Sequence, residues 1–159
     1  MIAELGHFTL ILALVMATFQ TIFPLVGAQK SNNVLMEMGK PAAIAQFFTI
    51  LFAFCALTNA YVTSDFSVVN VAENSHSLKP LLYKISGVWG NHEGSMILWV
   101  LILALFGLTV AVFGKNLPPT LRARVLGIQG LLGLAFLAFI IITSNPFLRL
   151  DPAPLNGRD

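Results

Sequence analysis

Two tryptophans, a histidine and a glutamate lie together in the stretch Trp89-Gly-Asn-His-Glu-Gly-Ser-Met-Ile-Leu-Trp99, where a polar loop meets an apolar run. The imidazole of His92 could ligate iron or donate a hydrogen bond to a carboxylate, with its partner supplied from elsewhere. Trp89 and Trp99 could form an apolar, aromatic shelf for a flat ligand. We therefore take Trp89, His92 and Trp99 as candidate cofactor-binding residues.

The same stretch predicts the start of a helix that positions these side chains. Asn91 is a favourable N-cap residue, and a carboxylate at Glu93 suits the positive end of a helix dipole. A helix that begins near His92 places His92, Met96 and Trp99 on one face. The loop-to-helix junction is therefore the part of the sequence that a functional interpretation must explain.

A purely structural interpretation competes with the cofactor-binding one. Tryptophans anchor helices at membrane interfaces, so Trp89 and Trp99 could do only that while His92 and Glu93 cap and solvate the helix. Residue chemistry alone favours this structural interpretation. The adjacent pair His92-Glu93 is too small a motif for a metal site, and the sequence identifies no catalytic residue and no metal ligand set.

Composition places the chain among multi-span membrane proteins. Of its 159 residues, 57% are hydrophobic and 10% are charged, and the mean hydropathy is +0.82, which is too apolar for a soluble domain of this size. No basic patch with interleaved aromatic residues is present, which argues against nucleic acid as a partner. The single cysteine, Cys55, lies in an apolar run and reads as a buried small hydrophobe.

Four apolar runs predict an all-α integral membrane protein with about four transmembrane helices. Each run is long enough, at about 1.5 Å per residue, to cross a hydrocarbon core of about 30 Å. The surrounding lipid is therefore an expected partner. The predicted spans are residues 5–26, 42–62, 94–113 and 125–143.

The charges of the connections predict how these spans are oriented. The connection 114–124 contains three basic residues and no acidic residue, and 27–41 contains two lysines against one glutamate. Both are assigned to the cytoplasm by the positive-inside rule. The loop 63–93, the polar tail 144–159 and both termini are then expected outside, with the tail leading into further chain or a partner.

Within the outer loop, the pattern from Pro80 predicts a short interfacial helix over residues 80–89, before the third span. Leu81, Leu82 and Ile85 would share a face of this helix. The segment 68–71, Val-Val-Asn-Val, is expected to be extended.

The interiors of the spans favour packing over transport. They carry no acidic, basic or histidine residue near mid-membrane, where ion-coupled carriers usually need one. Gly127, Gly130 and Gly133 recur in the fourth span, and small residues on a membrane helix let another backbone approach closely. We interpret them as bundle packing in preference to a ligand-approach surface.

The order of several motifs resembles the CcmF proteins, the haem lyase component of system I cytochrome c maturation. Trp89-Gly-x-x-Glu-Gly-Ser-x-x-Leu-Trp99 is similar to their first signature, and the residues at 1–8, 65–68 and 143–152 resemble their start, first outer loop and following segment. The related NrfE type shares much of this pattern. The motif residues are Trp89, Gly90, Glu93, Gly94, Ser95 and Trp99.

This resemblance implies a protein of the bacterial inner membrane with haem chemistry on the periplasmic face, or an organellar membrane protein if the gene is split. The family accepts haem from a haem chaperone, attaches it to apocytochrome c alongside other maturation subunits, and carries a haem b of its own besides the substrate haem. Its tryptophan-rich motif and haem-ligating histidines lie further along than this chain reaches. His7, His76 and His92 match none of those ligands, so the resemblance assigns no cofactor to this segment.

The expected role is therefore that of the N-terminal membrane segment of a haem lyase, with the Trp89–Trp99 edge facing haem or a partner. Lyase activity is implied for the full-length family member, and this segment alone is expected to be inactive. The alternatives are a non-catalytic scaffold subunit of a membrane assembly complex and, less favoured, a fragment of a transporter.

Overall fold

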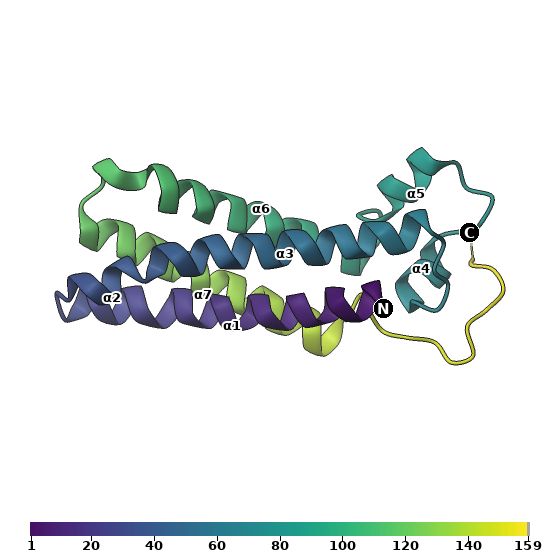
Figure 1. Ribbon diagram of the computed structural model, residues 1–159, viewed down its shortest axis with the longest axis horizontal. Helices are drawn as coiled ribbons and strands as arrows, with labels where there is room; N and C mark the ends of the chain where they lie inside the picture. Colours follow the sequence, from purple (N-terminus) through teal and green to yellow (C-terminus); the bar gives the residue numbers. More distant parts are fainter. Residues whose placement is uncertain (159) are drawn as a thin grey trace.

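The computed structural model describes residues 1–158 and shows a bundle of four long antiparallel helices (Figure 1). Each is long and apolar enough to cross a membrane, so the predicted all-α membrane architecture is confirmed. The helices contain the predicted spans and begin earlier than all four of them. Their bounds are α1 Ile2–Gln29, α3 Gly39–Val62, α6 His92–Phe113 and α7 Pro119–Thr143.

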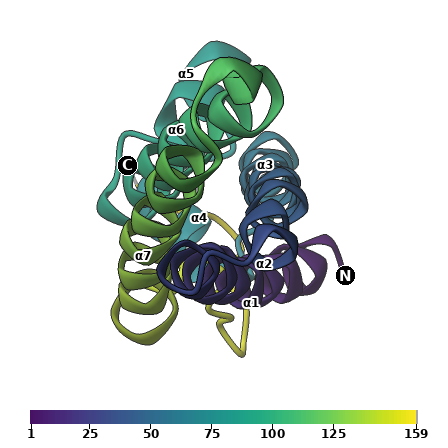
Figure 2. The same cartoon turned by 90° about the vertical axis from the view of Figure 1, so that its left-hand side faces the viewer.

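The four helices form a ring when seen along the bundle, in the order α1, α3, α6 and α7 (Figure 2). Each helix packs against its two neighbours in the ring, and α1 lies opposite α6. The short elements α4 (Val69–Asn74) and α5 (Leu81–Gly87) lie at the end of the bundle that also holds both ends of the described chain (Figure 1). We call this the α4–α5 end.

The core of the ring is filled by small and aliphatic side chains. Each of the four helices contributes fully buried residues. Close van der Waals packing of such side chains stabilises the association of helices in a membrane. Large apolar residues also cover the outside, as expected for helices that face lipid. The buried core includes Leu10, Ala13, Ile50, Leu57, Ile97, Val100, Leu137 and Ile140.

The glycines of the fourth span mark the places where α7 meets its neighbours. A Cβ at Gly127 would lie 2.5 Å from the side chain of Leu25, and one at Gly133 would lie 2.5 Å from Gln46. A Cβ at Gly130 would lie 3.0 Å from the backbone of α1. These contacts accord with the bundle-packing interpretation, because only a residue without a side chain permits such close approach.

One buried amide joins α1 to α7 inside the bundle. Gln20 is fully buried, and its Nε2 donates to the backbone oxygen of Leu126 at 3.0 Å. Hydrogen bonds between membrane helices add about 0.6 kcal/mol on average. Gln20 therefore fixes the register of the two helices as well as contributing modestly to their association.

The opposite end of the bundle is held by charged side chains. Arg122 is buried, and its guanidinium pairs with Glu37 and donates to the backbone oxygen of Gly114 at 3.4 Å. Glu37 also pairs with Lys40. The connection predicted over 114–124 is shorter than expected, because α7 begins at Pro119 and already includes Arg122. Proline is favoured at the first position of a helix, where its missing N–H costs nothing.

One local prediction at the α4–α5 end, an extended segment over residues 68–71, was wrong. Residues 69–71 are helical within α4, although Val68 is extended and forms an isolated bridge with Arg149. This error over residues 69–71 arises because contacts of the segment with α3 and the chain's tail override the local pattern. The helix predicted over residues 80–89 contains α5, in which Leu81 and Leu82 are exposed, while Val88, just beyond α5, is fully buried.

The tail returns to the beginning of the chain through Arg149. Its guanidinium contacts Glu4 in α1, with Nε 2.9 Å from Oε1, and Asp65 after α3, with Nη1 3.3 Å from Oδ2. Arg149 also donates to Ser67. The two ends of the described chain are therefore held together at the α4–α5 end.

Candidate functional site: a polar cap and an apolar groove

Asn91 caps α6 as the sequence predicts and also connects it to two other elements, α3 and α5. Its Oδ1 accepts from the backbone N–H of Gly94 at 2.8 Å, which satisfies one of the free amides of the first turn. Its Nδ2 donates to Tyr61 Oη and to the backbone oxygen of Gly87, each at 2.9 Å. One side chain therefore holds α6, α3 and the end of α5 together.

Asn70 of α4 completes this hydrogen-bonded cluster. Tyr61 Oη donates to Asn70 Oδ1 at 2.6 Å, and Asn70 Nδ2 donates to Asn91 Oδ1 at 2.9 Å and to Glu93 Oε2 at 3.0 Å. Tyr61 and Asn70 are both buried, so these bonds also satisfy groups that would be costly to leave unpaired. We call Tyr61, Asn70, Asn91 and Glu93 the polar cap.

The motif glycines and serine have local roles beside the polar cap. A Cβ at Gly94 would lie 1.6 Å from the backbone oxygen of Val88, so any other residue would force this turn apart. Gly90 lies in the turn and is exposed, and Ser95 Oγ donates to the backbone oxygen of His92 at 2.9 Å. Local packing and capping therefore explain the residue types at these motif positions.

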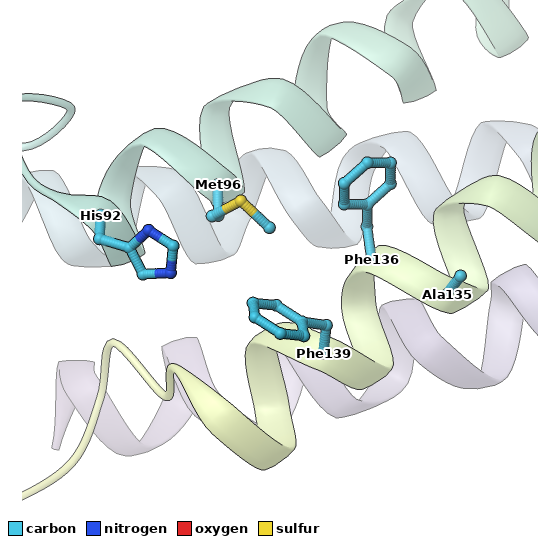
Figure 3. Close-up of a pocket in the computed structure, with 5 residues that line it drawn as sticks. All are labelled: His92, Met96, Ala135, Phe136 and Phe139. Carbon is cyan, nitrogen blue, oxygen red and sulfur yellow. The ribbon is translucent and has the colours of Figure 1, made fainter.

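His92 lines a groove between α6 and α7 (Figure 3). The groove has a volume of about 450 Å³ and lies near the α4–α5 end. The His92 ring lies 6.4 Å from the Phe139 ring between centroids, and the two planes are at 84°. Its lining residues are His92, Met96, Ala135, Phe136 and Phe139.

The two tryptophans lie outside this set of lining residues. Trp89 is 43% exposed at the turn before α6, and Trp99 is 64% exposed two turns into α6. The three candidate cofactor-binding residues therefore do not converge on one cavity. Exposed indoles at the level where a membrane helix begins are typical of interface anchors.

Sequence reasoning missed half of the polar cap and most of the groove. Nothing near Tyr61 or Asn70 in the sequence marks them as partners of Asn91, since each comes from a different element. Phe136 and Phe139 stand three residues apart in the fourth span, a spacing that puts both on one side of a helix. This spacing could have predicted from the sequence that the two phenylalanines lie on one face of the fourth span.

The residues of the chain thus define a class: a helical membrane protein with a hydrogen-bonded polar cap and an apolar groove at one end. No protein-family model matches the chain. Curated proteins match it along its whole length: it is 64% identical over 159 residues to the cytochrome c-type biogenesis protein ccl1 of Rhodobacter capsulatus, which it covers by 24%. It is 40% identical over 160 residues to CcmF of Escherichia coli, which it covers by 25%.

Comparison of the fold with solved structures agrees with these sequence matches. The solved structure of the cytochrome c haem lyase CcmF matches with a TM-score of 0.87 and 26% identity, over 92% of this chain and 25% of that one. Identity to the NrfE protein of Haemophilus influenzae is lower, at 35%. The chain corresponds to the N-terminal portion of a CcmF-type cytochrome c biogenesis protein, and it spans about a quarter of the length of these relatives.

Proposed function

We propose that the chain is the N-terminal membrane segment of a haem lyase that takes haem from a chaperone and helps to attach it to apocytochrome c. The observation that supports this most directly is the match in fold to a solved haem lyase, at a TM-score of 0.87 over 92% of the chain. Haem b, the substrate haem, the haem chaperone, apocytochrome c and other maturation subunits are partners of the complete protein in this proposal.

We further propose that the α4–α5 end faces the periplasm in the bacterial inner membrane. The opposite end carries five basic residues against Glu37 alone, in its connections and in the first turns of α3 and α7, which is the distribution expected of the cytoplasmic side. Both ends of the described chain then lie on the periplasmic side. The basic residues are Lys30, Lys40, Lys115, Arg122 and Arg124.

In this proposal the segment contributes positioning and no bond-making group. The polar cap fixes the start of α6, and through it the direction of His92, relative to α3 and α4. The tail, held by Arg149, brings the chain back to the same end. The rest of the protein, or a separately encoded partner, supplies the remaining groups.

The proposal is tested by removing the gene and measuring covalent haem in c-type cytochromes by haem staining. We expect the staining to disappear and to return when the complete gene is supplied again. Normal staining in the deletion strain would show that the protein is not required for cytochrome c maturation, and the proposed function would be wrong.

A scaffold subunit without haem contact is a second candidate function. The close contacts of Gly127 and Gly133 with neighbouring helices favour it, because they show an α7 built for packing. The double variant Trp89→Ala with His92→Ala, made in the complete protein, separates the two candidates. Unchanged cytochrome c yield at normal protein levels would favour the scaffold, and a loss of yield would favour the haem-facing role.

A further inference from the structure

The groove between α6 and α7 combines an apolar wall with one nitrogen donor. Its lining is formed by the thioether of Met96, the methyl group of Ala135 and the rings of Phe136 and Phe139, with His92 at the end nearest the polar cap. A volume of about 450 Å³ lies in the range of small-molecule and cofactor pockets. Such a lining suits a flat, apolar ligand that carries an atom to which an imidazole nitrogen can bind.

The imidazole of His92 is available to such a ligand. Within residues 1–158, no protein group hydrogen-bonds to either of its ring nitrogens, and the residue is exposed toward the groove. The ring meets Phe139 edge to face at 6.4 Å, which supports its orientation without using a nitrogen. Neutral imidazole nitrogens are common axial ligands of haem iron.

The position of the groove matches the amphiphilic shape of haem. The macrocycle is apolar and the propionates are charged, so the macrocycle suits the lipid-level wall of α6 and α7. His92 is the first residue of α6 and adjoins the polar cap, where the bundle passes from apolar to polar surroundings. The propionates can therefore remain in water while the macrocycle lies against Met96 and the phenyl rings.

We propose that this groove binds haem, with the macrocycle against Phe136 and Phe139 and the iron facing the His92 imidazole. The inference rests on the proposed function, since that function supplies haem as the ligand. It assigns a contact to this segment in addition to the histidines that the family resemblance places further along the protein.

Thiols placed in the groove test the contact without relying on lyase activity. In the complete protein with Cys55→Ala, we would introduce Ala135→Cys or Phe136→Cys. A thiol beside a haem vinyl group adds its S–H across the double bond, so that sulfur bonds to one vinyl carbon and hydrogen to the other. The product is measured as haem that stays on the polypeptide after denaturation and gel electrophoresis.

The chain's own Cys55 is the matched control, because it is exposed on another face of the bundle beside Leu5 and Phe52, and the prediction that it is buried was wrong. We expect haem on Ala135→Cys and Phe136→Cys and none on the parent that retains only Cys55. Equal labelling of Cys55 would mean non-specific haem in lipid and would overturn the proposal. A lipid chain or a neighbouring helix in the groove would leave both groove thiols unlabelled, which would also overturn it.

The contact between His92 and iron is tested by the spectrum of the purified complete protein with its bound haem. We expect His92→Ala to lose part of the low-spin ferric signal and added imidazole to restore it, while His76→Ala, in the loop, leaves the spectrum unchanged. An unchanged spectrum in His92→Ala would overturn the iron contact.

The two proposals fail in different ways. A deletion strain that still matures cytochrome c contradicts the proposed function, whatever the thiols report. Unlabelled groove thiols in a variant that restores maturation contradict only the assignment of haem to this groove.

Discussion

The polar cap predicts an unusual result for a substitution that helix capping alone would treat as neutral. Asp and Asn are equally good N-cap residues, because both offer an oxygen to the first turn. Asn91, however, also uses its amide as a donor to Tyr61 Oη and to the Gly87 carbonyl. Asn91→Asp keeps the acceptor, loses both donated bonds and places a carboxylate close to Glu93.

The size of the effect follows from these contacts. Loss of the cap costs about 1 kcal/mol, and each donated bond contributes about 1 kcal/mol. Asn91→Ala should therefore weaken the start of α6 by about 2–3 kcal/mol in total. Asn91→Asp should cost at least as much as the two lost bonds, about 2 kcal/mol, even though its cap is intact.

Hydrogen exchange of the complete protein in detergent measures this locally. The amides at the start of α6, including Gly94, should exchange roughly 30- to 150-fold faster in Asn91→Ala, and to a similar degree in Asn91→Asp. Amides in the middle of α1 serve as the internal control. Exchange in Asn91→Asp at the wild-type rate would refute the reasoning, because it would show that the cap alone stabilises this junction.

Two further predictions concern packing and orientation. Gly94→Ala should lower the amount of protein in the membrane, because its Cβ would lie 1.6 Å from the Val88 carbonyl oxygen, whereas Gly90→Ala should be tolerated because its nearest contact would be 3.5 Å. Immunoblotting of membranes compares them, and equal amounts would contradict the packing argument. Cysteines placed at Leu155 and Leu117, in a chain without other thiols, should react with an impermeant maleimide in intact spheroplasts only at Leu155. Labelling at Leu117 alone would reverse the proposed topology.

The four long helices could be predicted from sequence because a membrane span needs only a long apolar run. Their ends were harder to place. The basic residues at 122 and 124 suggested a loop, yet Arg122 lies inside α7, where it pairs with Glu37 from far earlier in the chain. A partner at that separation leaves no local pattern.

The candidate site was predictable in part for the same reason. Asn91 was recognised as a cap because capping is a local property of the chain. Asn70 was not, since Val68 to Val71 has the β-branched composition of a strand, and its helical form depends on the bonds from Asn70 to Tyr61 and Glu93. The groove requires the relative orientation of α6 and α7, which neither helix encodes by itself.

The hydrogen bond between Gln20 and the Leu126 carbonyl also bears on the order of biosynthesis. The donor is synthesised 106 residues before its acceptor. Chains are synthesised from the N-terminus, so α1 and α3 can pair first. During that time the amide of Gln20 lies in the membrane without its final hydrogen-bond acceptor. The ring closes only when α7 has entered the bilayer beside α1. A ribosome stalled before α7 would therefore leave three long helices in an open arrangement, which is the form that membrane quality-control proteases would be expected to recognise.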